Sequence, residues 1–153
     1  MSTAPLEQRR SRARLAFALL ALFLPLQILA MHWPLPKMPL GAWRIWDKAP
    51  HFIVYTVFAS LLVWYVVAQR RVLGKSNARG LARSFSMAFV CVASYAWLDE
   101  LTQPFTGRSC DVYDWLADIL GAGLVFVGAY IWRRCRGVAI ETPMSAEFGR
   151  VRV

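Results

Sequence analysis

Residues 51–68 read HFIVYTVFASLLVWYVVA, a run that contains no Asp, Glu, Lys or Arg. A helix rises about 1.5 Å per residue, so roughly 20 apolar residues cross the ~30 Å hydrocarbon layer of a bilayer. Three further blocks of the chain have similar length and apolarity. The sequence therefore predicts an all-α membrane protein, a compact bundle of four transmembrane helices at about 13–32, 51–69, 81–98 and 112–132.

The composition supports this class and excludes several others. Of 153 residues, 58% are hydrophobic and 18% are charged, whereas a soluble domain is about half apolar and a quarter charged. This balance excludes intrinsic disorder, collagen and coiled coil. The three cysteines, Cys91, Cys110 and Cys135, are scattered, which excludes a secreted disulfide scaffold. We expect one membrane domain at 13–132 between basic tails at 1–12 and 133–153.

The first block has a second interpretation, a cleaved signal peptide, because four arginines precede it and a small residue, Ala30, stands near its end. Its apolar stretch is longer than the ~7–15 residues of a signal-peptide core. We therefore expect a retained helix. Under either interpretation the chain leaves this block on the same side of the membrane.

The basic residues predict the orientation. Of the 18 Lys and Arg residues, four lie before or at the very start of the first span, five lie around the loop between the second and third spans, and five follow the fourth span. Loops rich in Lys and Arg stay in the cytoplasm. We therefore expect both termini in the cytoplasm and the protein in the cytoplasmic membrane. The net charge of +9 is then a topology signal, with membrane lipid as partner and no nucleic acid.

The acidic residues have a distribution that topology does not explain. Of nine acids, six gather at the opposite, outer ends of the second, third and fourth spans, although Asp and Glu contribute little to orientation. These six are Asp47, Asp99, Glu100, Asp111, Asp114 and Asp118. They are the first indication of a site.

The entry to the second span combines an acid, a base and a histidine. Pro50 suits the first turn of a helix, where its missing N–H has no cost. If the helix extends back, Asp47 and His51 are neighbours at i and i+4. A charged helix start with an interfacial histidine explains the same residues without any function, and this alternative stays open.

The end of the third span places two acids, Asp99 and Glu100, in a helix C-terminal turn. Pro104 disfavours a helical residue before it, so we expect the helix to end near Thr102. The helix dipole disfavours each acid there by roughly 0.3–1 kcal/mol. We expect Glu100 to have a buried partner, whereas Asp99 either has one or points into water.

The start of the fourth span carries three acids at i, i+3 and i+7. Asp111 is expected to cap the helix and Asp114 to complement the helix dipole. Asp118 lies a full turn deeper, where an acid costs on the order of 2.5–3.5 kcal/mol or somewhat less near the interface, so it should face the bundle interior. Small residues at 121–123 and 128–129 let another helix approach closely.

Charges of both signs at the membrane surface are typical of a functional site. The sequence offers as ligand-binding candidates Asp47, Lys48, His51, Asp99, Glu100, Gln103, Arg108, Asp114 and Asp118. Its catalytic candidates are His51, Glu100 and Asp114. No pair of side chains has a spacing diagnostic of a metal site, so the sequence by itself assigns neither a metal nor a cofactor.

At these positions the sequence resembles the VanZ-like family of small bacterial membrane proteins. That family pattern has Asp-Lys-x-x-His-Phe at the head of one span, matched at 47–52, and Asp-Glu-x-x-Gln after another, matched at 99–103. A Gly-Arg pair follows at 107–108, and Asp114 and Gly121 match an Asp-x-x-x-Asn-x-x-Gly element. The chain departs from the pattern at Asp118, where the family tends to carry Asn.

The resemblance implies a four- or five-helix membrane domain and a link to the bacterial cell envelope. The namesake is associated with tolerance of the glycopeptide teicoplanin. No settled reaction comes with the family, so the resemblance implies an antibiotic-resistance role without supplying a mechanism.

Three functions remain in competition. In the first, the site binds or protects an envelope component such as a lipid-linked precursor, with Lys48 and Arg108 on its anionic group and Gln103 and Asp99 as hydrogen-bonding groups. In the second, an enzyme acts on a lipid headgroup with Glu100 or Asp114 as base and His51 as its acid–base partner, or with a metal on His51, Asp114 and Asp118. In the third, the charges only lock the helices together.

Overall fold

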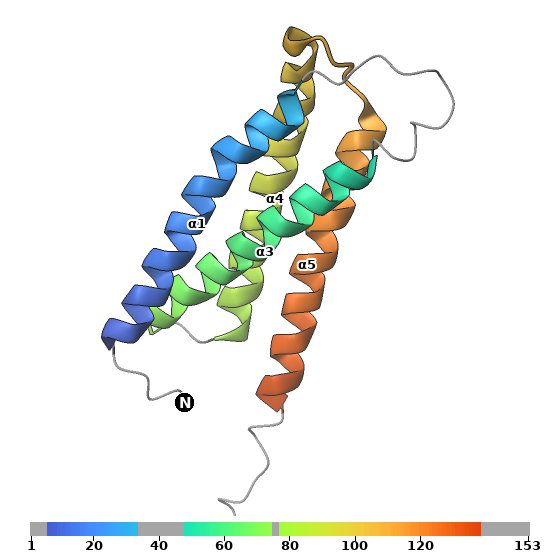
Figure 1. Cartoon of the computed structure of the whole chain (residues 1–153). Helices are drawn as coiled ribbons and strands as arrows, with labels where there is room; N and C mark the ends of the chain where they lie inside the picture. The colour runs from blue at the N-terminus through green and yellow to red at the C-terminus, as the bar shows by residue number, and fades with distance from the viewer. Residues whose placement is uncertain (1–5, 34–47, 75–76, 139–153) are drawn as a thin grey trace, which may run out of the picture.

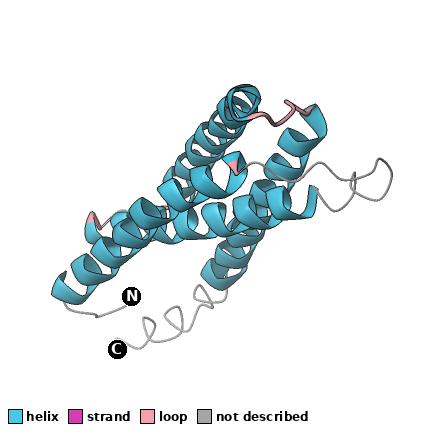
Figure 2. Cartoon of the chain, turned by 45° about the horizontal axis from the view of Figure 1, so that its top comes forward, coloured by secondary structure: helices cyan, strands magenta, loops and turns pink. Residues whose placement is uncertain are grey.

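The computed structural model describes residues 6–33, 48–74 and 77–138, and all elements within these ranges are helical. They are α1 (Leu6–His32), α3 (Lys48–Val72), α4 (Ala78–Thr102), the short 3₁₀ helix η1 (Gln103–Thr106) and α5 (Val112–Val138). The four α-helices are each long and apolar enough to cross a membrane. The described residues contain no strand (Figure 2), so the predicted four-helix class is confirmed.

The four helices run antiparallel to their neighbours in the chain and form one bundle (Figure 1). One end, which we call the cluster end, contains the last turns of α1 and α4 and the first turns of α3 and α5. The opposite end, which we call the basic end, contains the start of α1, the α3–α4 connection and the end of α5. Five of the six acids singled out from the sequence therefore lie at one end of the bundle, and Asp47 lies outside the described residues.

The helices extend beyond the predicted apolar spans at the basic end. α1 begins at Leu6 and α5 continues to Val138, so basic residues assigned to the tails form helical turns instead. Arginine and alanine are good helix formers, and a helix does not have to stop where the hydrocarbon does. Hydropathy located the membrane-crossing part of each helix but not its end.

Aromatic and small side chains form the core of the bundle. Phe126 of α5 meets Phe85 and Phe89 of α4 edge to face, with ring centroids 5.8 and 6.0 Å apart. Phe58 of α3 packs on Tyr95 of α4 in the same manner. Large apolar side chains cover much of the outer surface, among them Leu22, Val90, Leu120 and Leu124. This pattern of apolar residues both inside and outside is expected of helices that lipid surrounds.

The most extensive contact between two helices joins α3 and α5, and Gly121 lets their backbones approach closely there. A Cβ atom at this position would lie 2.5 Å from the Phe52 carbonyl oxygen and 2.8 Å from the Thr56 hydroxyl. Only a residue without a side chain allows the two backbones to come this near. The contact lies one turn from Asp118, so it also sets the distance between the His51 turn of α3 and the Asp118 turn of α5.

The cluster end is completed by the chain reversal after α4. The helix ends at Thr102, as Pro104 predicted, and η1 continues the chain to Gly107, whose φ of 81° is a left-handed conformation that favours glycine. This reversal leads into α5. The Asp111 side chain accepts a hydrogen bond from the Tyr113 N–H at 2.9 Å, which confirms the predicted helix cap.

Candidate functional site

Six polar or ionisable side chains converge inside the cluster end, and each is less than 5% exposed. They come from three helical segments far apart in the sequence: one from the first turn of α3, three from the end of α4 and η1, and two from the start of α5. We call this set the floor of the site, and its members are His51, Asp99, Glu100, Gln103, Asp114 and Asp118. So much buried polarity in an otherwise apolar bundle has to be satisfied internally.

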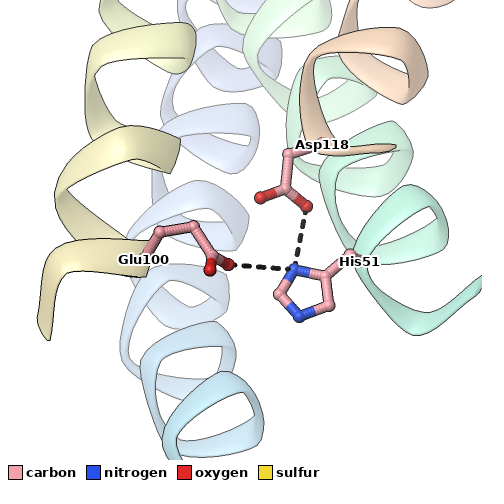
Figure 3. A group of neighbouring side chains, drawn as sticks. All are labelled: His51, Glu100 and Asp118. Carbon is pink, nitrogen blue, oxygen red and sulfur yellow. Dashed lines mark hydrogen bonds and ion pairs between the residues drawn. The ribbon is translucent and has the colours of Figure 1, made fainter. Parts of the chain in front are cut away.

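His51 lies at the centre of the floor, with carboxylates on both sides of its ring. Its Nδ1 atom is 3.1 Å from Asp118 Oδ1 and 3.6 Å from Glu100 Oε1 (Figure 3). Its Nε2 atom faces Asp114 Oδ2 at 3.9 Å. The histidine is 1% exposed, so these contacts form away from bulk water. The charge interactions are therefore screened far less than they would be at a surface.

Glu100 is fully buried and points into the bundle rather than into water. Gln103 donates its side-chain N–H to Glu100 Oε1 at 2.7 Å, and the Asp111 backbone N–H donates to Glu100 Oε2 at 3.0 Å. Gln103 lies one turn after Glu100, and the reversal after α4 brings the Asp111 N–H back to it. Because each carboxylate oxygen has its own donor, the Glu100 side chain is held in one orientation.

Lys48 and Asp111 form a half-buried margin, which we call the rim, between the floor and the surroundings. The Lys48 ammonium donates to Asp111 Oδ2 at 2.6 Å and also pairs with Asp114. The Lys48 and Asp111 side chains are 23% and 31% exposed, whereas that of Asp114 is 2% exposed. Lys48 therefore connects the rim to the floor and compensates charge in both.

Asp99 belongs to a second branch of the cluster, on the α1 side. It is 4% exposed, so it has a buried partner and does not point into water. Tyr55 donates to Asp99 Oδ2 at 3.4 Å, and His32 Nδ1 lies 3.6 Å from Asp99 Oδ1. The other ring nitrogen of His32 is 2.9 Å from the Thr102 hydroxyl. This branch ties the last turn of α1 to the last turn of α4.

His32 and Tyr55 are residues that sequence reasoning did not include among the candidates. His32 ends the first apolar span and Asp99 follows the third, which is a signal, but nothing local shows that α1 ends beside Asp99. Arg108 also reaches α1, where it donates to the Met31 carbonyl oxygen at 2.9 Å. Asp47, the remaining candidate, lies outside the described residues. All other predicted site residues are at the cluster end.

The arrangement supports two kinds of chemistry. An imidazole between carboxylates can pass a proton, with one carboxylate orienting the ring and another accepting from it. The same groups can hold a cation, since one ligand atom each from His51, Glu100 and Asp118 lie within 4.8 Å of one another. This trio differs from the metal set considered from sequence, because Asp114 faces the opposite ring nitrogen and Glu100 takes its place.

Comparison with known proteins leads to the same family that the motifs resemble. No curated protein and no solved structure matches the chain. The model of the VanZ/LLP1 family, in contrast, matches residues 2–133, which include the whole described cluster. Since this match covers most of the chain, the protein belongs to the VanZ/LLP1 family.

Proposed function

We propose that this protein acts in the bacterial cell envelope, with its cluster end facing outwards, where it binds or protects a lipid-linked envelope component. The observation that supports this proposal most directly is the convergence of six buried polar side chains at one end of an apolar bundle. Buried ionisable groups within a membrane are costly and are generally found where a protein handles ions, protons or substrates. A bundle needs none of them to fold.

The predicted topology supports the outward direction. The cluster end is opposite the end that carries most Lys and Arg residues, and the latter is expected in the cytoplasm. The rim would then lie at the level of lipid headgroups on the outer side. There it could meet the polar part of a lipid-linked precursor while the acyl or prenyl chain stays in the bilayer.

The charges of the site favour ligand groups that donate hydrogen bonds. Lys48, which sequence reasoning assigned to an anionic ligand, is already shared by two carboxylates. The Gln103 side-chain oxygen and Asp118 Oδ2, in contrast, are buried and accept no hydrogen bond from a described residue. Amide N–H and sugar hydroxyl groups would complement such acceptors, whereas a phosphate needs additional positive charge.

A second candidate function is an enzyme that acts on a headgroup, and the contacts of His51 favour it. Its ring nitrogens face Asp118 and Glu100 on one side and Asp114 on the other. In this candidate His51 moves a proton between a carboxylate and the attacking or leaving oxygen of a lipid headgroup. Arg108, which follows η1 at the cluster end, would stabilise negative charge on a phosphate.

The first experiment compares Glu100→Gln with wild type in a host that lacks its own copy of the gene. The substitution is nearly isosteric and removes one floor charge. Membrane assembly and sensitivity to glycopeptides and other envelope-targeting drugs are scored together. We expect full assembly with loss of the drug phenotype. The matched control is Glu7→Gln, the same change on the exposed first turn of α1 at the basic end, which should alter neither readout.

Each other outcome contradicts the proposal in a specific way. An assembled Glu100→Gln protein with an unaltered phenotype would show that the cluster is not the working site. Failure of Glu100→Gln to assemble, while Glu7→Gln assembles, would show that Glu100 locks the helices and that the cluster is structural.

For the enzyme candidate, purified protein is incubated with a lipid-linked precursor. Headgroup release that requires His51 favours catalysis, and binding without turnover favours the first function.

A further inference from the structure

The side chains of His51, Glu100 and Asp118 come from three different helices and aim at one shared space (Figure 3). His51 Nδ1 is 3.1 Å from Asp118 Oδ1 and 3.6 Å from Glu100 Oε1. Ligand atoms bound tetrahedrally at 2.0–2.1 Å from a zinc ion lie about 3.3 Å from one another. The two measured separations lie on either side of that value. All three ligand atoms lie within 4.8 Å of one another, so the groups are close enough to share one ion.

Protein groups alone do not balance the charge of two ionised carboxylates in the trio. Among the described residues, Glu100 and Asp118 each find one ion-pair partner, and it is the same His51 ring. With both carboxyl groups ionised, even a protonated imidazole would leave one negative charge at a place that is 0–1% exposed. An uncompensated buried charge is strongly unfavourable. A divalent cation with a neutral imidazole balances both carboxylates.

A second observation points to a missing ligand. Asp118 Oδ2 is buried and has no hydrogen-bond partner among the described residues, although the other oxygen of the same carboxylate contacts His51. Buried polar atoms in native proteins are almost always satisfied.

The surrounding groups are arranged as outer-shell partners of a metal usually are. A histidine that ligates a metal commonly directs its other ring nitrogen to a carboxylate. His51 Nε2 faces Asp114 Oδ2 at 3.9 Å, which is an ion-pair distance and longer than a hydrogen bond, and Lys48 pairs with Asp114. The ligating carboxylates are themselves hydrogen-bonded in such sites. Glu100 accepts from Gln103 and from the Asp111 N–H, and each of its oxygens keeps a second lone pair for an ion.

We infer that His51 Nδ1, Glu100 and Asp118 bind one divalent transition-metal ion between α3, α4 and α5. One imidazole with two carboxylates suits a borderline ion such as Zn²⁺ or Mn²⁺. Three protein ligands leave a position for water or for an oxygen of a bound headgroup. The ion would thus provide the positive charge that Lys48 cannot offer to a phosphate. In this respect the inference rests on the proposed function, although metal binding itself can be measured without any ligand.

The test uses full-length, tag-free protein purified in detergent, stripped with a chelator and titrated with Zn²⁺ and, separately, Mn²⁺. We expect one ion per chain for wild type. His51→Gln and Asp118→Asn should each weaken binding by more than 100-fold. Gln103→Leu, which removes only a donor to Glu100, should weaken binding by about 10- to 100-fold. The matched control is His32→Gln, because this histidine lies at the same end but outside the trio, and it should bind as wild type does.

Three results would overturn the inference: no saturable binding of either ion to wild type up to millimolar concentration, equal affinity in wild type and in His51→Gln, or loss of binding in His32→Gln alone. If a variant does not fold, the coordination of the ion is instead measured by spectroscopy on wild type. Co²⁺ in place of the ion should show four- or five-coordinate absorption bands without a thiolate band, and an octahedral spectrum would contradict the geometry. If purified wild type binds no metal but still confers the drug phenotype in cells, the metal site is rejected and the proposed function stands.

Discussion

The two halves of the bundle are formed by the same helices but filled in opposite ways. Towards the basic end, the space between α4 and α5 contains Phe85, Phe89 and Phe126, which pack edge to face. Towards the cluster end, the same two helices enclose Glu100 and Asp118. Packing stabilises the first half, whereas the buried polar groups of the second half lower its stability. The difference indicates that the aromatic half provides most of the stability of the fold and that the cluster end carries the functional groups.

The largest effect on stability is therefore expected in the aromatic half. Phe126→Ala removes the ring that contacts both Phe85 and Phe89. Truncation of a buried Phe costs about 3–5 kcal/mol because dispersion contacts are lost and a cavity remains. Unfolding of the purified protein in mixed micelles measures this loss. Phe105→Ala is the control, since Phe105 is 88% exposed and its loss should have little effect. Equal losses in the two variants would contradict the comparison.

The next effect is expected at the boundary between the halves. Gly121→Ala places a methyl group against the Phe52 carbonyl and forces α3 and α5 apart, for which overpacking costs of about 1–3 kcal/mol are typical. Gly128→Ala is the matched control on the same helix, where an added Cβ meets nothing within 4 Å. The same unfolding assay should show destabilisation by Gly121→Ala and a neutral or slightly favourable change by Gly128→Ala. The reverse order would refute the close approach.

Gly121→Ala should also sharpen the comparison, because it moves His51 relative to Asp118. Zn²⁺ affinity of the folded fraction is expected to fall along with stability, although no ligand is changed. Gly128→Ala should leave the affinity as it is. Unaltered affinity in Gly121→Ala would mean that the trio adapts to helix separation and is not held by the α3–α5 contact.

A smaller effect is expected from the polar contacts of the basic end. The Arg70 guanidinium donates to the Gly80 carbonyl at 2.8 Å, to Ser84 Oγ at 3.1 Å and to Asn77 Oδ1 at 2.9 Å, so it joins α3 to the start of α4. Arg70→Gln should cost about 1–2 kcal/mol in the same assay. Arg71→Gln makes the identical charge change at an exposed neighbour and should cost less. If both cost the same, charge rather than these bonds would be responsible.

Local signals explain why much of the fold could be predicted. Hydropathy identified four spans because a helix in lipid needs a long apolar run, whatever its neighbours are. The Asp111 cap and the end of α4 before Pro104 were predictable because both depend on a few adjacent residues. The inward orientation of Asp118 could be predicted because neither a helix cap nor the helix dipole explains an acid one turn inside an apolar span. In the structure Asp118 is 0% exposed.

The partners within the cluster could not be predicted, because they depend on how each helix is rotated and which helices adjoin. The sequence placed Asp114 and Asp118 on one stripe, and one version of the enzyme alternative grouped both with His51 around a metal. In the structure, Asp114 meets the other side of the ring, and Glu100 of α4 completes the trio. The pairing of Lys48 with two acids was equally hidden. Because Lys48 already pairs with Asp111 and Asp114, it has less positive charge to offer an anionic ligand than the binding function considered from the sequence requires.

The smallest effect on stability is predicted for Asp118, although we expect this residue to be essential for metal binding. Asp118→Asn keeps the shape of the side chain and removes one of two carboxylates that compete for His51. Replacing a costly buried charge is often neutral or stabilising, so we expect a change within about 1 kcal/mol, of either sign. Metal affinity and the drug phenotype should nevertheless be lost. Breaking a helix lock would instead cost about 3–5 kcal/mol. A loss of that size would show that Asp118 holds the fold, and the distinction between the two halves would fail at its central residue.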